Sequence, residues 1–222
     1  MSVQQNRNQN SVIIAGIDPS IRKAAIVWEF DALYSDVIDR PNVSPDIIAN
    51  VEMLNRLEWV GIELVERGIP VYVCIEEQVA LRGAGELAGV AYWSIIQGLC
   101  SHPATEVYLL KAAPTQVKKF VTNNGRARTS EVTPVVVQRW PQEVDQVGTQ
   151  EDTLMALAMM KMSICAYDYV TVAKPTMGRL SEFDPKNCWT KFQWDIIEQM
   201  VHGKGNRKSR LIQLGGRDDN SQ

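Results

Sequence analysis

The stretch SVIIAGIDPS, residues 11–20, decides the fold that the sequence predicts. Its apolar residues run without polar alternation as far as Ile17, which is typical of a strand buried on both faces of a sheet. Asp18 follows directly, and Pro19 cannot continue a hydrogen-bonded ladder, so the chain turns there. The stretch therefore predicts one carboxylate held at the end of a rigid strand.

A second apolar run ends in the same way. The stretch IPVYVCIEEQ, residues 69–78, is rich in β-branched and aromatic residues and ends in Glu76 and Glu77, which predicts another strand that delivers carboxylates. Two such strands would bring Asp18 and Glu76 to one edge of a sheet. Because like charges at close range are costly, the pair points to a divalent cation, whereas Asp18 alone also fits an ordinary Asp-Pro turn.

Composition limits the class of protein. The chain has 222 residues, 45% of them hydrophobic, which suits one domain with a sizeable core. Its net charge of −3 means that any surface for nucleic acid must be local. The first ten residues are polar and predict a disordered tail rather than a secretory signal, and no apolar run suits a bilayer. The widely spaced cysteines are expected to be reduced thiols of a cytoplasmic protein.

The rest of the chain alternates strands and helices. We expect a strand at 23–30, antiparallel to the first, and then a polar loop up to Pro41. Ser44 is the expected cap of a helix with Pro45 at its first position, and Gly68 predicts the end of that helix. Further helices are expected at 85–100, 115–121, 129–140, from 149 onward and at 190–203, with another strand at 106–110.

Cations gather in three places along the chain. The loop TNNGRAR, residues 122–128, contains Gly125, whose expected positive φ would let backbone amides approach a phosphate, although a solvated basic loop fits the same composition. A second group lies in the turn after Asp18, and a third follows the terminal helix. The residues expected to contact a nucleic-acid backbone are Arg22, Lys23, Lys118, Lys119, Arg126, Arg128, Lys204, Arg207, Lys208 and Arg210.

Two more acids, Glu151 and Asp152, precede the apolar helix TLMALAMMKMSICA. Thr149 with Asp152 three positions later resembles a capping box, which is a purely structural interpretation of these acids. A helix packed against the sheet would also aim Asp152 at the edge that carries Asp18 and Glu76. The two interpretations are compatible, because both place Asp152 in the first turn.

Taken in order, these motifs resemble the RuvC family of Holliday-junction resolvases, within the ribonuclease H-like superfamily. The ordered set is GIDPS, IEEQ, APTQVKKFVTNNGRARTSEV and a carboxylate before MALAMM, covering about residues 11–166. The resemblance implies an α/β fold, a ribonuclease H-like mixed β-sheet flanked by helices. It divides the chain into a disordered tail at 1–10, a RuvC-like nuclease domain at 11–173, and a C-terminal extension at 174–222 with a helix and a basic tail.

The resemblance also implies an activity and its residues. It implies a homodimer that resolves four-way or other branched DNA junctions in DNA recombination and repair. Each active site would use two Mg²⁺ or Mn²⁺ ions, in the cytoplasm of a bacterial or phage-infected cell or in an organelle. Carried over to this chain, Asp18 bridges the metals, Glu76 ligates beside it, Asp152 supplies a carboxylate from the last helix, and Lys118 is the family's basic residue.

The chain departs from the family pattern at two positions. The family places two acids three residues apart on the last helix, and the second position is here Met155, a poor ligand for a hard cation. Glu151 is the candidate replacement. The family's second basic position falls on Thr129, beside Arg128, and Glu77 is a less expected ligand than Glu76. The two histidines are expected to be bystanders.

Two other functions stay open on the sequence alone. A weakened metal site would leave a RuvC-like protein that binds junctions without cutting them. A ribonuclease H-like nuclease acting on another nucleic acid, such as an RNA–DNA hybrid, would use the same acids. Junction selectivity depends on the spacing of two active sites across a dimer, which no motif encodes.

Overall fold

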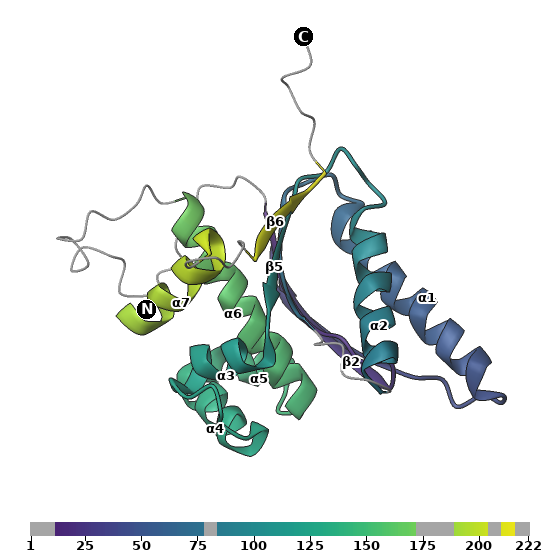
Figure 1. The fold of residues 1–222 in the computed structure, drawn as a ribbon, viewed down its shortest axis with the longest axis horizontal. Helices are drawn as coiled ribbons and strands as arrows, with labels where there is room; N and C mark the ends of the chain where they lie inside the picture. The colour runs from purple at the N-terminus through teal and green to yellow at the C-terminus, as the bar shows by residue number, and fades with distance from the viewer. Residues whose placement is uncertain (1–11, 78–83, 172–188, 204–209, 216–222) are drawn as a thin grey trace, which may run out of the picture.

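The computed structural model describes residues 12–77, 84–171, 189–203 and 210–215 (Figure 1). Its strands are β1 (Ile13–Asp18), β2 (Lys23–Glu29), β3 (Leu33–Asp39), β4 (Val71–Glu76), β5 (Val107–Ala112) and β6 (Leu211–Leu214). Its helices are α1 (Asp46–Val65), α2 (Ala84–Leu99), α3 (Pro114–Thr122), α4 (Thr129–Arg139), α5 (Pro141–Val147), α6 (Glu151–Thr171) and α7 (Lys191–His202).

The strands form one mixed sheet in the order β3-β2-β1-β4-β5-β6. The pairs β1–β4 and β4–β5 are parallel, whereas β1–β2, β2–β3 and β5–β6 are antiparallel. Helices α1 and α2 cover one face, and α6 lies on the other with α3, α4, α5 and α7 around it (Figure 1). The mixed sheet flanked by helices is the fold class that the sequence predicted.

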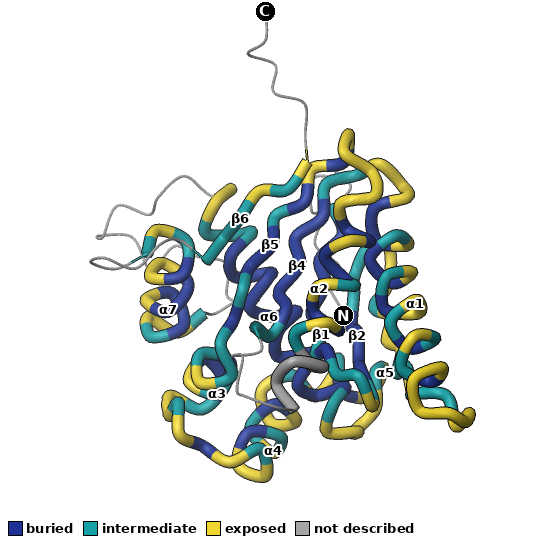
Figure 2. Tube along the Cα trace, turned by 45° about the vertical axis from the view of Figure 1, so that its right-hand side comes forward, coloured by how far each residue is buried: buried dark blue, intermediate teal, exposed yellow. Residues whose placement is uncertain are grey.

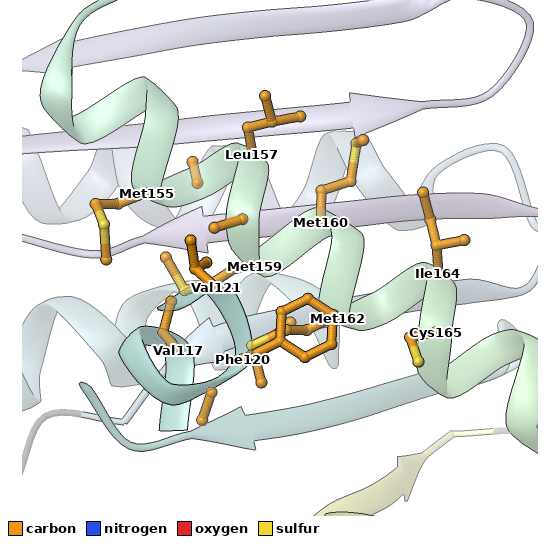
Figure 3. Packing of buried hydrophobic residues seen from close by; sticks show 14 of the residues in the cluster. Val117, Phe120, Val121, Met155, Leu157, Met159, Met160, Met162, Ile164 and Cys165 are labelled. Carbon is orange, nitrogen blue, oxygen red and sulfur yellow. The ribbon is translucent and has the colours of Figure 1, made fainter. Parts of the chain in front are cut away.

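Side-chain alternation divides the core into two apolar layers. Figure 2 shows that the central strands of the sheet are largely buried. Ile13, Ala15 and Ile17 of β1 pack toward α1 and α2, as do Val71, Val73 and Ile75 of β4. The intervening positions, among them Ile14 and Cys74, pack toward α6. Met159 and Met160 of that helix belong to the same cluster (Figure 3). Because side chains alternate with a period of two, Asp18 and Glu76 belong to the α6 face at the ends of their strands.

Helix α6 crosses β1 at Gly16 with no space between the two backbones. A Cβ at Gly16 would lie 2.1 Å from the amide nitrogen of Met160 and 2.2 Å from the carbonyl oxygen of Ala156. Farther along the helix, Ser163 donates a 2.7 Å hydrogen bond to the carbonyl oxygen of Ala15. The helix therefore runs antiparallel to β1, and its N-terminus lies toward the strand end that carries Asp18.

Three local expectations were wrong. The polar segment before Pro41 was expected to be a loop, but it contains strand β3 at the edge of the sheet, and most side chains of this strand are exposed. Pro45 is the cap of α1 rather than its first residue, and no side chain caps that end. In the basic loop the positive φ belongs to Asn123, at +64°, and not to Gly125.

The C-terminal extension contributes to the same sheet and core. Helix α7 begins at a capping box between Thr190 and Gln193, as expected from a hydroxyl followed by an amide three residues later. Its apolar residues pack in the layer that contains α6, and β6 extends the sheet beyond β5. Among the described helices, none combines the length and the apolar character needed to cross a membrane.

The crossing at Gly16 predicts a specific sensitivity. Gly16→Ala should lower the free energy of unfolding by more than about 2 kcal/mol, because the new methyl meets backbone atoms that cannot rotate away. Gly89→Ala in α2 is the matched control, since a Cβ there meets nothing within 4 Å and alanine favours a helix. Chemical denaturation of both variants measures the difference, and equal stability of the two would contradict the close crossing.

Candidate active site

Carboxylates from three elements meet at one edge of the sheet. Asp18 ends β1, Glu76 ends the neighbouring parallel strand β4, and both belong to the α6 face. Glu151 and Asp152 open α6. Asp152 is one helical turn before Ala156, whose carbonyl approaches Gly16, so the helix start lies level with the end of β1.

The charges of these acids act on one another. Burial is the main cause that raises the pKa of Asp18 from 3.8 to about 8, and repulsion from Glu76, Asp152 and Glu151 raises it further. Burial also raises the pKa of Glu76, which the nearby positive charge of Lys118 partly offsets. The four residues carried over from the family resemblance, Asp18, Glu76, Asp152 and Lys118, and the candidate replacement Glu151 are therefore linked by electrostatic interactions.

Lys23 is an additional member of this cluster. Its Nζ lies 3.1 Å from Oδ2 of Asp152 and donates a 3.4 Å hydrogen bond to Gln150. The sequence placed Lys23 in a turn near Asp18, but the pairing joins residues far apart in the chain and no local motif indicates it. Strand β2 thus supplies a cation to the start of α6.

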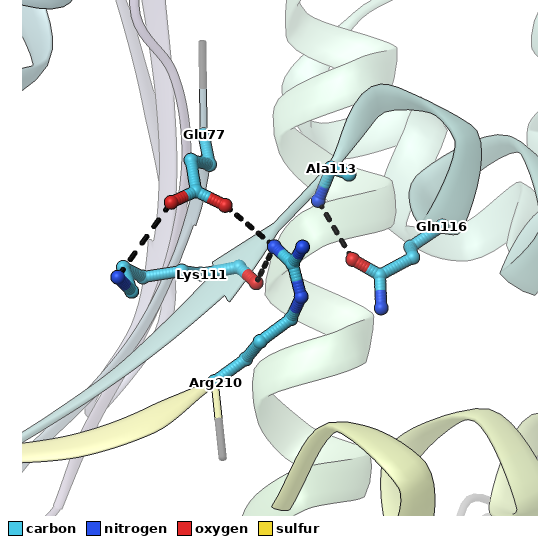
Figure 4. A network of polar contacts seen from close by, with 5 residues as sticks. All are labelled: Glu77, Lys111, Ala113, Gln116 and Arg210. Carbon is cyan, nitrogen blue, oxygen red and sulfur yellow. Dashed lines mark hydrogen bonds and ion pairs between the residues drawn. The ribbon is translucent and has the colours of Figure 1, made fainter. Parts of the chain in front are cut away.

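Glu77 is occupied elsewhere. Its carboxylate accepts a 2.5 Å hydrogen bond from Arg210 and lies 3.6 Å from the Nζ of Lys111 (Figure 4). Arg210 also bonds through its backbone to Met200 at the end of α7 and to Lys111 of β5. This network fastens the C-terminal segment to the residue that follows Glu76, and it agrees with the expectation that Glu76 rather than Glu77 faces the site.

Met155 occupies the position where the family pattern has an acid. It is only 6% exposed and belongs to the apolar cluster on the α6 face (Figure 3). Its side chain therefore serves packing. Besides Asp152, the acid of α6 that acts on Asp18 is Glu151. Glu151 lies one helical turn before Met155 and is exposed.

The donor set fits a hard divalent cation in type and charge. All four acids offer oxygen, which Mg²⁺ and Mn²⁺ prefer. Burial is the main cause of the raised pKa of Asp18, and repulsion from Glu76, Asp152 and Glu151 adds to it, so a bound cation would relieve part of the cost of ionising Asp18. Within the described residues, no three His, Cys, Asp or Glu side chains are gathered closely enough to hold an ion as they stand. The acids would therefore have to draw together around a bound cation.

The other basic residues predicted to bind nucleic acid are less closely tied to the acids. Arg126 and Arg128 are exposed in the loop between α3 and α4, and Arg22 is exposed in the turn after β1. Lys119 lies over the ring of Phe192, 5.5 Å from its centroid. Lys204, Arg207 and Lys208 lie outside the described residues.

The fold is similar to that of RuvC. A structure of T. thermophilus RuvC in complex with a Holliday junction substrate aligns with a TM-score of 0.50 and 22% identity, covering 67% of this chain and 90% of that one. A second structure, of Thermus thermophilus RuvC, aligns with a TM-score of 0.53 and 19% identity, covering 71% of this chain and 95% of that one. No family model and no curated protein matches the sequence.

This likeness confirms the RuvC-like fold predicted from the ordered motifs. At 19–22% identity, it shows the fold alone. What the chain does must therefore be argued from its own acids and cations.

The pKa of Asp18 predicts a pH-dependent stability. Between its unfolded value near 3.8 and its folded value of about 8, the folded protein holds a proton that the unfolded chain has lost. The free energy of unfolding should therefore fall as pH rises through this window. Asp18→Asn lacks the ionisable group, so in EDTA it should match wild type near pH 4 and exceed its stability by more than about 1 kcal/mol near pH 9.

Urea denaturation at the two pH values measures this difference. Asp195→Asn, which removes an exposed acid of α7, is the control and should show no such divergence. A constant offset between Asp18→Asn and wild type across the pH range would mean that Asp18 ionises normally.

Proposed function

We propose that this chain is a divalent-metal-dependent endonuclease that resolves four-way DNA junctions. The observation that carries the proposal is the meeting of Asp18, Glu76 and Asp152 at one sheet edge with Lys118 beside them, on a RuvC-like fold. One solved structure of that fold is a complex with a Holliday junction substrate. Half-buried acids that repel one another, with raised pKa values at Asp18 and Glu76, suit phosphodiester hydrolysis better than a purely structural role.

The residues have separate tasks in the proposed reaction. Asp18, Glu76 and Asp152 would hold Mg²⁺ or Mn²⁺, with two ions expected per site. The chemistry supplied by the bound ions would be activation of water for in-line attack and stabilisation of the leaving 3′ oxygen. Lys118, close to Glu76, offers positive charge to a phosphate oxygen. Arg22, Arg126 and Arg128 would follow the phosphate backbone, with Lys204, Arg207 and Lys208 as a further proposed contact.

We also propose that the active form is a homodimer, because cutting a junction symmetrically needs two active sites. The α1–α2 layer supports this proposal through large exposed apolar side chains. Trp93 is 65% and Val90 44% exposed on α2, and Ile47 is 69% exposed on α1. Such exposure is more typical of an interface than of a solvated surface.

Junction cleavage tests the proposal. Wild type should cut a four-way junction in Mg²⁺ or Mn²⁺ in preference to a linear duplex and an RNA–DNA hybrid. Asp18→Asn should keep junction affinity but lose cleavage by on the order of a hundredfold or more, because it removes a ligand charge while preserving shape. Asp195→Asn is the control that should cut normally. Preferred cleavage of the hybrid would instead support a ribonuclease H-like nuclease.

A specific observation keeps a second function in view, since Met155 is buried where an acid was expected. A protein that binds junctions without cutting them would have this feature. We expect instead that Glu151 compensates, because it acts on Asp18 from the same helix end. Glu151→Gln should then reduce cleavage sharply, with Asp145→Asn, a change at an exposed acid of α5, as control.

The binding-only function predicts a different pattern. Glu151→Gln would then matter little, and Met155→Asp would raise cleavage from a low base. Met155→Leu keeps the packed volume and separates a change in the core from the gain of a carboxylate. Tight junction binding with no cleavage by wild type in either metal would favour the binding-only function.

A further inference from the structure

A groove of about 730 Å³ runs between the edge strand β3 and helix α1. Asp36 and Asp39 line it from the strand, and Glu52, Trp59 and Glu63 line it from the helix. It lies on the α1 face of the sheet, opposite the face that carries the candidate active site. None of its lining residues has a part in the proposed nuclease reaction.

A smaller pocket of about 170 Å³ lies next to the groove. Asp36, Val60 and Glu63 line both spaces, so the two are neighbours. The pocket has an apolar and aromatic wall that includes Trp28, stacked on Tyr34 with ring centroids 5.4 Å apart. It therefore offers a place for one apolar side chain beside the polar groove.

Strand β3 presents backbone hydrogen-bonding groups along this groove. It is an end strand of the described sheet. The amide of Arg40 donates a hydrogen bond to the carbonyl of Arg22. In the antiparallel register every second residue counted back from Arg40, Asp36 among them, therefore exchanges hydrogen bonds with β2. Ser35, Val37 and Asp39 therefore direct their backbone groups away from β2, and of these the amide of Val37 donates a 2.8 Å hydrogen bond to the carboxylate of Asp36. A row of outward groups on an edge strand is a template for an added strand.

The negative charge of the groove limits which strands can be added beside β3. The groove carries four acids and Arg56, whose guanidinium pairs with Glu52 at 2.6 Å. The surplus negative charge repels a nucleic-acid backbone and attracts lysine and arginine side chains. Trp59 is 57% exposed and donates a hydrogen bond to Glu63, so an aromatic face is held among these acids. Lysine and arginine can pack on such a face.

We propose that this groove binds an extended, lysine- or arginine-rich segment of a partner protein. The segment lies as a strand beside β3, its cations meet Asp36, Asp39 and Glu63, and one apolar side chain enters the pocket. Arg210 of this chain is tied to Glu77 at the opposite edge of the sheet, so it is not the cation that the groove would take.

The test uses the blocked peptide Lys-Lys-Lys-Leu-Lys-Lys-Lys, which as a strand presents lysines on the same face as its leucine, and calorimetric titration of the full chain at low salt. The peptide should bind, and the double variant Asp36→Lys with Glu63→Lys should weaken binding by at least about tenfold. The double variant Asp195→Lys with Glu198→Lys reverses two exposed acids of α7 and is the matched control for net charge; it should bind as wild type does. Unchanged affinity of the double variant would overturn the proposal.

Two further arms test strand addition itself. The peptide with proline in place of its central leucine should bind at least about tenfold more weakly, since proline cannot extend a ladder. Ser35→Pro removes an outward amide without touching the bonds to β2 and should weaken binding similarly. Should Ser35→Pro fail to fold, the charge variants and the prolyl peptide still decide. Equal binding of the prolyl peptide, or preference for an all-glutamate version, would contradict the proposal.

Discussion

The crossing of α6 over β1 at Gly16 is the constraint on which the candidate active site depends. Only a residue without a side chain allows the strand to touch the backbone at Ala156 and Met160. Once that contact forms, the helix direction fixes the start of α6 level with the end of β1. Asp152 then reaches Asp18 without any special loop, and the parallel neighbour β4 brings Glu76 to the same edge.

Two groups of charged residues lie at the same edge of the sheet, one with excess negative charge and one in which acid and cations are paired. At the first, Asp18 and the three acids that act on it outnumber the cations Lys23 and Lys118, and repulsion from these acids adds to the effect of burial in raising the pKa of Asp18. One residue beyond Glu76, Glu77 is balanced by Lys111 and Arg210. Glu77 and its two cations join β5 and the C-terminal segment to the end of β4, whereas the acids around Asp18 carry excess negative charge that suits a bound cation. Position along the strand end thus separates a structural acid from a candidate ligand.

Much of this arrangement could be predicted from local sequence. The buried runs before Asp18 and Glu76 indicated strands and the residues at their ends, and the resemblance carried the order of the acids. Strand β3 was missed because an edge strand with exposed Ser35, Asp36 and Asp39 has the composition of a loop. The pairing of Lys23 with Asp152 and that of Glu77 with Arg210 were missed because each joins distant parts of the chain. No local pattern encodes such contacts.

The central claim is that Asp18, Glu76 and Asp152 form a site for a divalent cation. The most direct measurement is calorimetric titration of Mn²⁺ into the metal-free protein, followed by the same titration of Asp18→Asn. The account predicts that wild type binds Mn²⁺ and that Asp18→Asn binds it at least about tenfold more weakly while remaining folded. Wild type that binds no Mn²⁺, or a variant that binds it equally well, would contradict the account.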